Sequence, residues 1–377
     1  MKGISENSVF SVHEPSNTAQ ATNKGNSTFV QQRFMRGKDT SFSTIRFSAE
    51  RNAIRNRIFG IQSDDAFLQL ALEVYRYQFA NNSVYRAWSG ALNRNPENVR
   101  SIYDIPFLPI HFFKEQEVRS GEADAECVFS SSGTTGAITS RHYIYDVSIY
   151  RESILKGFER AYGKPEDYCI VGLLPSYLER SGSSLVWMTE LLIKESKHPD
   201  SGFYLYNHND LNDLLRKLEA DNQKIWLIGV SFALIDFSML HPLAPSNIYV
   251  IETGGMKGRR REMVRDELHA TIKQGWPLKR IDSEYGMTEL LSQAWMLDET
   301  YFNCPPWMKV MIRESDNPRA YVSDGKTGGI NVIDLANLDS CAFIETADLG
   351  RITPGKGFEV LGRFDHADVR GCNLMLA

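Results

Sequence analysis

A seven-residue stretch without an apolar side chain, Ser130 to Gly136, separates two β-prone runs of the chain. Cys127-Val128-Phe129 precedes it, and Ser140-Arg141-His142 leads from it into Tyr143-Ile144-Tyr145, so the pattern predicts two strands joined by a polar turn. Glycine lets a backbone approach a polyanion closely, and consecutive N–H groups and hydroxyls donate to phosphate oxygens. An ordinary polar hairpin has the same composition, so the downstream sequence has to decide between the two. The candidate phosphate-binding residues are Ser132, Gly133, Thr134, Thr135 and Gly136.

The composition is that of a soluble protein with one large domain or two modest ones, because 42% of the 377 residues are hydrophobic and 24% are charged. No apolar run approaches the roughly 18 residues that span a bilayer. The N-terminus lacks an apolar signal core, so we expect a cytoplasmic protein. A net charge of −5 gives a nucleic-acid partner no electrostatic support. The five cysteines are scattered without a C-x-x-C pair, which indicates reduced thiols.

The order of apolar and polar segments predicts an α/β core over residues 46–320. Residues 1–45 are rich in Ser, Asn, Thr and Gln, and we expect them to form a flexible or externally docked arm. A helical region from Phe47 to Leu92 opens the core, and buried parallel strands then alternate with amphipathic helices, which is typical of doubly wound sheets with crossover helices. The predicted strands are Cys169–Leu174, Lys224–Val230 and Ile248–Glu252, and the predicted helices are Ser148–Tyr162, Ser184–Glu195, Asp210–Ala220 and Arg260–Lys273.

The last part of the chain, residues 321–377, has a different texture. Short β-prone runs alternate with Gly-rich turns, at Gly329–Leu335, Ala342–Thr346 and Gly357–Leu361. We therefore expect a small β-rich subdomain, followed by a tail that contains Cys372.

Three further motifs follow the polar loop in order, at Ser283–Glu289 (SEYGMTE), Glu345–Gly350 (ETADLG) and Gly362–Asp365 (GRFD). Together with the loop they resemble the core motifs of the adenylate-forming superfamily, which includes acyl-CoA synthetases, luciferases and the adenylation domains of peptide synthetases. Asp348 alone would be interpreted as a turn-capping side chain, but ordered matches of this kind are hard to obtain by chance. The resemblance implies that Asp348 and Arg363 bind the ribose, and that ATP and Mg²⁺ are the cofactors.

A nucleotide site needs a flat face for the base, donors for the phosphates and a carboxylate for Mg²⁺. Tyr285 offers the flat face, although a lone tyrosine is as often a core aromatic. The Gly254-Gly255 turn directly after a predicted strand lets the backbone pass beside the edge of the base. The superfamily resemblance implies that Thr288 meets the α-phosphate and that Glu289 holds the metal ion.

A narrower resemblance rests on the loop with Ser140-Arg141-His142, on Leu174–Arg180 with Ser183–Val186, and on the tail Arg370-Gly371-Cys372-Asn373-Leu374. These segments resemble the acyl-protein synthetases of bacterial bioluminescence, the LuxE family of long-chain fatty acid luciferin-component ligases. The resemblance covers roughly residues 100–377. Arg141 stands where most acyl-CoA synthetases carry a lysine, and it is a candidate catalytic residue together with Thr288 and Cys372.

Membership of that family would imply that a fatty acid is activated as its acyl-adenylate and then transferred to Cys372, for delivery to an acyl-reductase partner. A thiolate is a strong nucleophile toward a mixed anhydride, and Arg370 nearby would favour the ionised form. Larger adenylate-forming enzymes continue beyond the Gly-Arg-x-Asp hinge into a mobile C-terminal domain with a catalytic lysine. This sequence ends twelve residues after Asp365, so we expect an N-domain-like fold without that domain.

Two alternatives to this interpretation remain open at the level of sequence. One is a stand-alone CoA ligase of the phenylacetate type, which shares the adenylation chemistry. The other is a nucleotide-binding interaction protein without catalytic activity. The basic cluster of Lys257, Arg259, Arg260 and Arg261 could form a nucleic-acid patch. Acidic residues follow it at once and no aromatic residues alternate with it, so we expect a solvated helix start near an anionic ligand.

Overall fold

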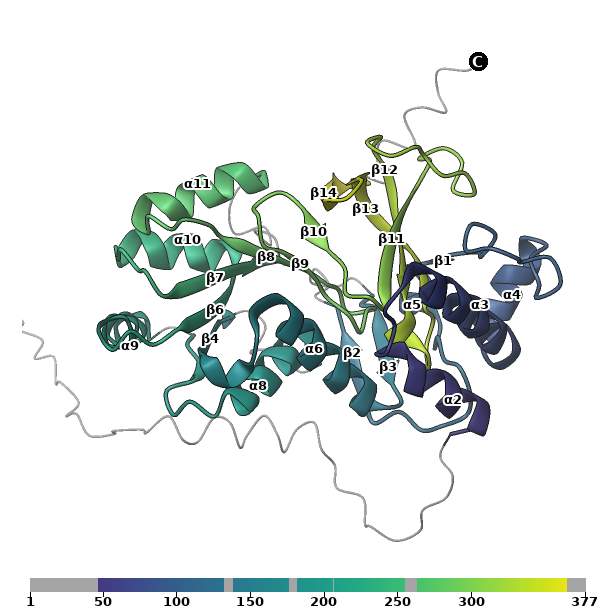
Figure 1. The fold of residues 1–377 in the computed structure, drawn as a ribbon, viewed down its shortest axis with the longest axis horizontal. Coiled ribbons are helices and arrows are strands. Elements are labelled where there is room, and N and C mark those ends of the chain that lie inside the picture. Colours follow the sequence, from purple (N-terminus) through teal and green to yellow (C-terminus); the bar gives the residue numbers. More distant parts are fainter. Residues whose placement is uncertain (1–46, 132–137, 176–181, 206, 255–262, 365–377) are drawn as a thin grey trace, which may run out of the picture. The chain divides into compact units, whose positions relative to one another are not determined.

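A twelve-stranded mixed sheet organises the residues that the structure describes (Figure 1). The computed structural model describes residues 47–131, 138–175, 182–205, 207–254 and 263–364. The strands are β1 (Leu108–Pro109), β2 (Cys127–Ser130), β3 (Arg141–Ile144), β4 (Cys169–Leu173), β5 (Gly202–Phe203), β6 (Ile225–Val230), β7 (Ile248–Thr253), β8 (Asp282–Tyr285), β9 (Ala294–Met296), β10 (Phe302–Asn303), β11 (Met308–Arg313), β12 (Gly328–Asp334), β13 (Phe343–Thr353) and β14 (Gly357–Arg363).

The helices begin where the sequence offers a capping side chain. Ser63 accepts a hydrogen bond from the Ala66 N–H (3.2 Å), Asp146 from the Ser148 N–H (3.0 Å) and Ser183 from the Val186 N–H (3.3 Å), each at a helix start. Within the described ranges, no helix is both long and apolar enough to cross a membrane. The helices are α2 (Ala49–Ile58), α3 (Asp64–Asn81), α4 (Ser83–Ala91), α5 (Phe112–Glu115), α6 (Val147–Tyr162), α8 (Ser184–Ser196), α9 (His208–Ala220), α10 (Ser231–Leu240) and α11 (Arg265–Gly275), with 3₁₀ turns η2 (Pro165–Asp167) and η3 (Leu335–Asn337).

The sheet changes from parallel to antiparallel pairing at β8. Its strands lie in the order β11-β12-β13-β14-β10-β9-β8-β7-β6-β4-β5, and β1 pairs in parallel with β13. Strands β5, β4, β6, β7 and β8 are parallel neighbours, whereas each pair from β8–β9 to β12–β11 is antiparallel. β2 and β3 form a separate antiparallel ribbon.

Helices cover both faces of the parallel strands. Successive side chains of a strand point to opposite faces, and here Trp226 and Ile228 of β6 belong to the core that α6 and α8 complete. Ile225 and Leu227 belong to a second core, which α9, α10 and α11 complete. Figure 1 shows α6 and α8 on one side of the strands and α10 and α11 on the other. The predicted α/β fold with doubly wound parallel strands and a β-rich C-terminal part is therefore confirmed.

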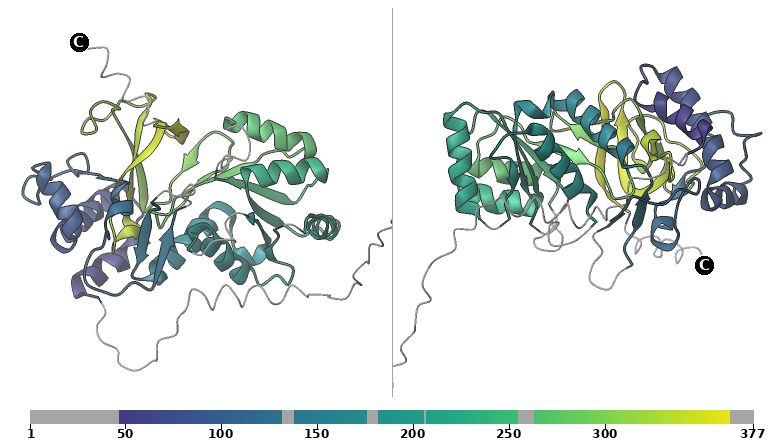
Figure 2. Two further views of the ribbon diagram at one scale, coloured as in Figure 1. Left: turned by 180° about the vertical axis from the view of Figure 1, so that it is seen from behind. Right: turned by 90° about the horizontal axis from the view of Figure 1, so that it is seen from below.

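The N-terminal helices pack on the C-terminal strands. The rings of Tyr75 in α3 and Tyr85 in α4 contact Phe343 in β13, with centroids 6.3 and 5.9 Å away. Gln78 of α3 donates to the carbonyls of Asn337 (2.8 Å) and Leu338 (3.0 Å). Figure 2 shows the N-terminal helices beside the C-terminal strands in both of its views. Segments far apart in sequence thus share one core.

Several predicted elements differ in detail from the structure. The helix expected from Arg260 begins at Arg265, with residues 255–262 outside the described ranges. The predominantly apolar helix α10 was not predicted. The segment from Ile105 to Lys114 contains the short strand β1 and part of the single-turn helix α5, neither of which was among the predicted elements. Strand β11 lies before residue 320 in the sequence and pairs with β12, which lies after it. The predicted arm over residues 1–45 and the predicted domain boundary at residue 320 stay predictions.

Candidate active site

Three predicted nucleotide-binding side chains from three strands meet at the carboxyl end of β8. The hydroxyl of Tyr285 donates to Asp348 Oδ2 (2.9 Å). Arg363 lies opposite Asp348 in the pairing of β14 with β13, and its Nε is 3.3 Å from Asp348 Oδ1. Burial raises the pKa of the Asp348 carboxyl, and Arg363 and the Tyr285 hydroxyl oppose that shift. The Tyr285 ring packs edge-on against Phe358 at 5.4 Å.

The turn after β8 contacts the stem of the polar loop. Burial raises the pKa of Glu289, which is 5% exposed, and a hydrogen bond from the Ser140 side chain opposes the shift. Ser140 closes the loop, because its N–H donates to Ser131 Oγ (2.9 Å) and its carbonyl accepts from the Ser131 N–H (3.0 Å). His142 Nδ1 lies 2.9 Å from the carbonyl oxygen of Thr288. Two motifs separated by more than a hundred residues therefore meet directly.

Buried polar side chains from η3 and the end of β12 hold the same turn. Asn337 donates from Nδ2 to the Glu289 carbonyl (2.8 Å). Asp334 accepts from the Leu291 N–H (2.8 Å) and from the Ser292 hydroxyl (2.6 Å). Burial raises the pKa of Asp334 to about 6. These side chains were not predicted from the sequence, although three polar residues within the apolar run INVIDLAN were a usable sign of buried hydrogen bonding.

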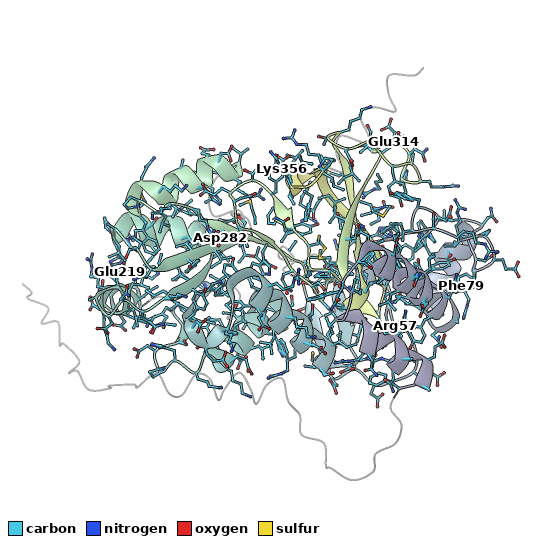
Figure 3. The ribbon with its side chains drawn as sticks, viewed as in Figure 1. Arg57, Phe79, Glu219, Asp282, Glu314 and Lys356 are labelled. Atoms are coloured by element: carbon cyan, nitrogen blue, oxygen red, sulfur yellow. The ribbon has the colours of Figure 1, made fainter. Side chains whose placement is uncertain are left out.

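Two carboxylates near the ends of β7 and β8, the buried Glu252 and the partly exposed Glu284, were not predicted as site residues either. Glu252 accepts from the hydroxyls of Ser283 (2.7 Å) and Ser231 (3.2 Å). Glu284 Oε2 accepts from the Thr253 hydroxyl (2.6 Å), and burial raises the pKa of Glu284 to about 7. Asp282, labelled in Figure 3, is the first residue of the same strand β8. Acidic side chains therefore concentrate along β8 and its neighbour.

The remaining predicted site residues lie apart from these contacts or outside the described ranges. Gly254 follows β7 with a φ of 66°, and its carbonyl accepts from the Ser231 hydroxyl. Arg141 opens β3 with an exposed side chain whose guanidinium carbon is 6.0 Å from the Tyr143 ring centroid. The predicted residues outside the described ranges are Ser132, Gly133, Thr134, Thr135, Gly136, Gly255 and Cys372.

The predicted Mg²⁺ would need ligands from the described residues. No group of three or more His, Cys, Asp or Glu side chains within them has the arrangement of a metal site. Mg²⁺ at phosphoryl-transfer sites takes one or two carboxylates and completes its shell with phosphate oxygens and water. Glu289 is the carboxylate that the family resemblance assigns to Mg²⁺, and the nucleotide-binding roles of Tyr285 and Asp348 stay predictions; all three side chains are largely buried.

Among solved structures, a CoA ligase has a similar fold. 2-Hydroxyisobutyryl-CoA ligase in the postadenylation state, in complex with 2-HIB-AMP, matches with a TM-score of 0.61 and 14% identity over 87% of this chain and 74% of that chain. An ATP-bound RpMatB-BxBclM chimera matches with a TM-score of 0.47 and 16% identity over 65% of this chain and 49% of that chain. ATP-bound MatB from Rhodopseudomonas palustris matches with a TM-score of 0.47 and 14% identity over 63% of this chain and 48% of that chain. The chain thus spans about half the length of these two structures. No curated protein matches it.

The fold is accordingly that of the adenylate-forming ligases. A family model described as acyl-protein synthetase, LuxE, matches residues 61–377. Because this match covers most of the chain, the protein belongs to the LuxE acyl-protein synthetase family. The family resemblance predicted from the motifs is confirmed, and it begins earlier than expected, near the start of α3.

Proposed function

We propose that the protein uses ATP to activate a carboxylic acid as its acyl-adenylate and then transfers the acyl group to the thiol of Cys372. Family membership suggests a fatty acid as the substrate. The observation that carries the proposal is the junction of motifs, in which Ser140 and His142 from the loop stem contact Glu289 and Thr288. Phosphoryl chemistry depends mainly on positioning and charge stabilisation, and this junction supplies a fixed frame for both.

The predicted site residues would have the following roles in this reaction. Tyr285 would stack on the base, while Asp348 would accept from the ribose hydroxyls, oriented by Tyr285 and Arg363. A carboxylate oxygen of the substrate attacks the α-phosphorus, and pyrophosphate leaves. Thr288 would donate to the α-phosphate, Arg141 would add positive charge near the loop, and Glu289 would hold Mg²⁺, which neutralises phosphate charge. Thr134 and Thr135 would hold the outer phosphates.

In the second step, the thiolate of Cys372 attacks the acyl carbon, a thioester forms and AMP leaves. The other four cysteines suit this step poorly, because burial raises the thiol pKa of each to about 12. The thiolate is the nucleophile, so thiols of that pKa are almost fully protonated near neutral pH. Cys372 is therefore our proposed acceptor. We also propose an acyl-reductase as the partner and the cytoplasm as the location, both on the basis of the family resemblance.

The alternative acceptor is CoA, and one observation favours it. The similar ligase has been solved with 2-HIB-AMP and CoA in the thioesterification state, matching with a TM-score of 0.61. Release of free acyl-CoA by a Cys372→Ala variant would establish the CoA-ligase alternative. Absence of carboxylate-dependent pyrophosphate exchange across a broad acid panel would instead indicate an inactive nucleotide-binding protein.

Intact-mass measurement after incubation with ATP, Mg²⁺ and a panel of carboxylic acids tests the proposal. We expect one acyl mass per chain, which neutral hydroxylamine removes as it does other thioesters. An unchanged mass with every acid, including long-chain fatty acids, would contradict acyl transfer to the protein.

A further inference from the structure

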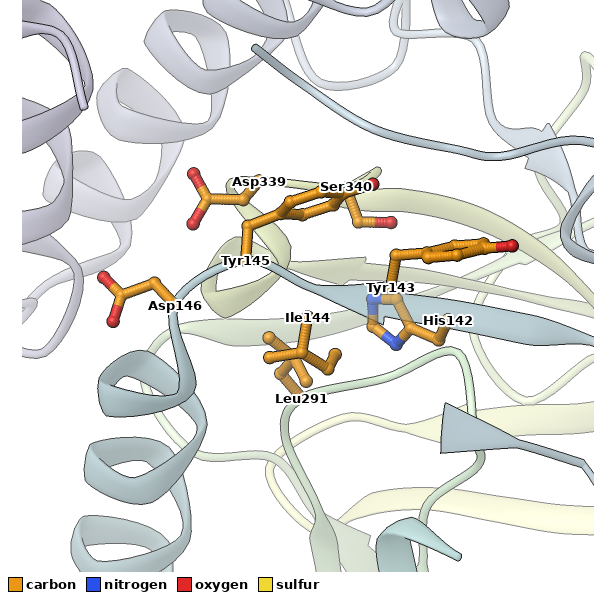
Figure 4. Close-up of a pocket in the computed structure, with 8 residues that line it drawn as sticks. All are labelled: His142, Tyr143, Ile144, Tyr145, Asp146, Leu291, Asp339 and Ser340. Carbon is orange, nitrogen blue, oxygen red and sulfur yellow. The ribbon is translucent and has the colours of Figure 1, made fainter. Parts of the chain in front are cut away.

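His142 is a buried histidine that the proposed chemistry has not used. Its side chain is 1% exposed, and its ring lies edge-on to Phe113 with centroids 5.6 Å apart. Nδ1 is 2.9 Å from the Thr288 carbonyl oxygen, whereas Nε2 is buried and has no hydrogen-bond partner among the described residues. Figure 4 shows His142 and Leu291 among the residues that line a small cavity of about 10 Å³, which has room for about one water molecule. A cavity of this size has no room for a phosphate group, and the hydrogen bond that the structure shows for His142 is to the protein itself.

The contact with Thr288 defines the state of the ring. A carbonyl oxygen only accepts, so Nδ1 carries the hydrogen and donates it. Burial lowers the pKa of the imidazole to about 4, so the ring is neutral near physiological pH and has its single proton on Nδ1. His142 is therefore a neutral donor of fixed direction.

The Thr288 carbonyl has no place in a strand ladder, because residue 288 lies in the turn between β8 and β9. Side chains bind the backbone carbonyls of this turn instead of a neighbouring strand. His142 holds the carbonyl of Thr288, and Asn337 holds the next carbonyl, that of Glu289 (2.8 Å). His142 lies opposite Phe129 in the ribbon, one residue from the Ser130–Arg141 pair that borders the loop. One hydrogen bond thus connects the strand leaving the phosphate loop to the turn with Thr288 and Glu289.

We propose that His142 is a positioning residue that holds the Thr288–Glu289 turn in register with the phosphate loop. The proposal rests on the proposed adenylation reaction for its effect on turnover, but not for its structural content. Because a misplacement of about 1 Å can cost about a hundredfold in rate, loss of this hydrogen bond affects the turnover number more than the binding of ATP.

Replacements of His142 that shift the N–H donor by one bond test whether its position matters. His142→Asn keeps an amide N–H near the position of Nδ1, His142→Gln carries the same group further out, and His142→Leu removes it. His269 provides a matched control, since it is 5% exposed and its Nε2 also has no partner among the described residues. It lies on α11, an element that contains neither the loop stem nor the turn.

Pyrophosphate exchange in the full-length protein measures turnover and the ATP KM. We expect His142→Leu and His142→Gln to lower kcat at least tenfold with the ATP KM within about threefold of wild type, and His142→Asn to restore kcat to within about threefold of wild type. His269→Leu should lower the melting temperature without this loss of kcat. Wild-type kcat in His142→Leu, or equal kcat in the Asn and Gln variants, would overturn the positioning role.

Amide hydrogen exchange, followed by mass spectrometry, separates this idea from the proposed function. We expect peptides covering residues 286–293 to exchange at least tenfold faster in His142→Leu and to be unchanged in His269→Leu. Wild type that catalyses no pyrophosphate exchange with any acid would contradict the proposed function. If the 286–293 peptides still exchange their amide hydrogens faster in His142→Leu, the positioning role stands. An unchanged peptide in His142→Leu would overturn the positioning role whatever the activity.

Discussion

The buried carboxyl of Asp334 gives the protein a pH dependence that one substitution removes. Its folded-state pKa is raised by burial from 3.8 to about 6. The folded chain therefore binds this proton more tightly than the unfolded chain, and stability is lost as the pH rises from the lower value to the higher one. Between pH 5 and pH 8 the loss amounts to about 1.5 kcal/mol of unfolding free energy. Asp334→Asn has no proton to lose and should lack this term.

The substitution also changes hydrogen bonding, by an amount that does not depend on pH. Asn keeps one acceptor and places an NH₂ group where the Leu291 N–H or the Ser292 hydroxyl donates in wild type. A lost partner in this buried position costs about 1–3 kcal/mol. We therefore expect wild type to be more stable than Asp334→Asn at pH 5, with an advantage that shrinks by about 1.5 kcal/mol at pH 8.

Urea unfolding of both proteins from pH 5 to pH 8, followed by tryptophan fluorescence, measures this difference. Asp104→Asn is the control. Burial of the Asp104 carboxyl acts against the shift, but hydrogen bonds from the Arg100 and Ser101 N–H groups lower its pKa, so its contribution is complete above pH 5. Its difference from wild type should stay flat over this range. A wild-type advantage over Asp334→Asn that stays constant or grows with pH would refute the reasoning.

Three further predictions concern the proposed reaction. Replacing Thr134 and Thr135 together by valine keeps their shape and deletes two hydrogen-bond donors, each worth about 1–3 kcal/mol if phosphate is left unpaired. The rate of pyrophosphate exchange or the affinity for ATP should therefore fall at least tenfold. Unchanged pyrophosphate exchange in a folded variant would remove the loop from the mechanism. Glu289→Gln should lower kcat far more than substrate binding, and a wild-type exchange rate at saturating Mg²⁺ would show that the metal assignment is wrong. Cys372→Ser should keep pyrophosphate exchange and lose the hydroxylamine-labile adduct, whereas an adduct mapped to Cys127 or Cys341 would contradict the role of the tail.

Local patterns in the sequence predicted local structure well. The ribbon of β2 and β3 forms where β-prone runs flank the polar loop, and Ser63 caps α3 as its position before two aspartates suggests. The parallel strands follow from short apolar runs, which burial on both faces explains. Helix α10 was missed because its few polar residues form no polar face and because it directly continues the apolar strand β6, so no periodicity separates the two elements.

Contacts across the chain were not accessible to the same reasoning. The ordered motifs predicted that Tyr285, Asp348 and Arg363 belong to one site, and the structure brings these three side chains together, although their roles toward a nucleotide stay predictions. The contact of His142 with Thr288 joins residues 146 positions apart. The spacing of residues in the sequence does not indicate that these two are in contact, since neither belongs to a pattern that points to the other segment. Only the paths of the strands place them together.

The packing of Tyr75 and Tyr85 on Phe343 has a consequence for synthesis on the ribosome. Their apolar faces emerge more than 250 residues before the strand that covers them. Contacts this distant in sequence form late, and apolar surface that waits for its partner is prone to aggregation. A nascent chain that does not yet include Phe343 would expose the apolar faces of α3 and α4. Chaperones that bind apolar surface would cover these faces until β13 has been synthesised.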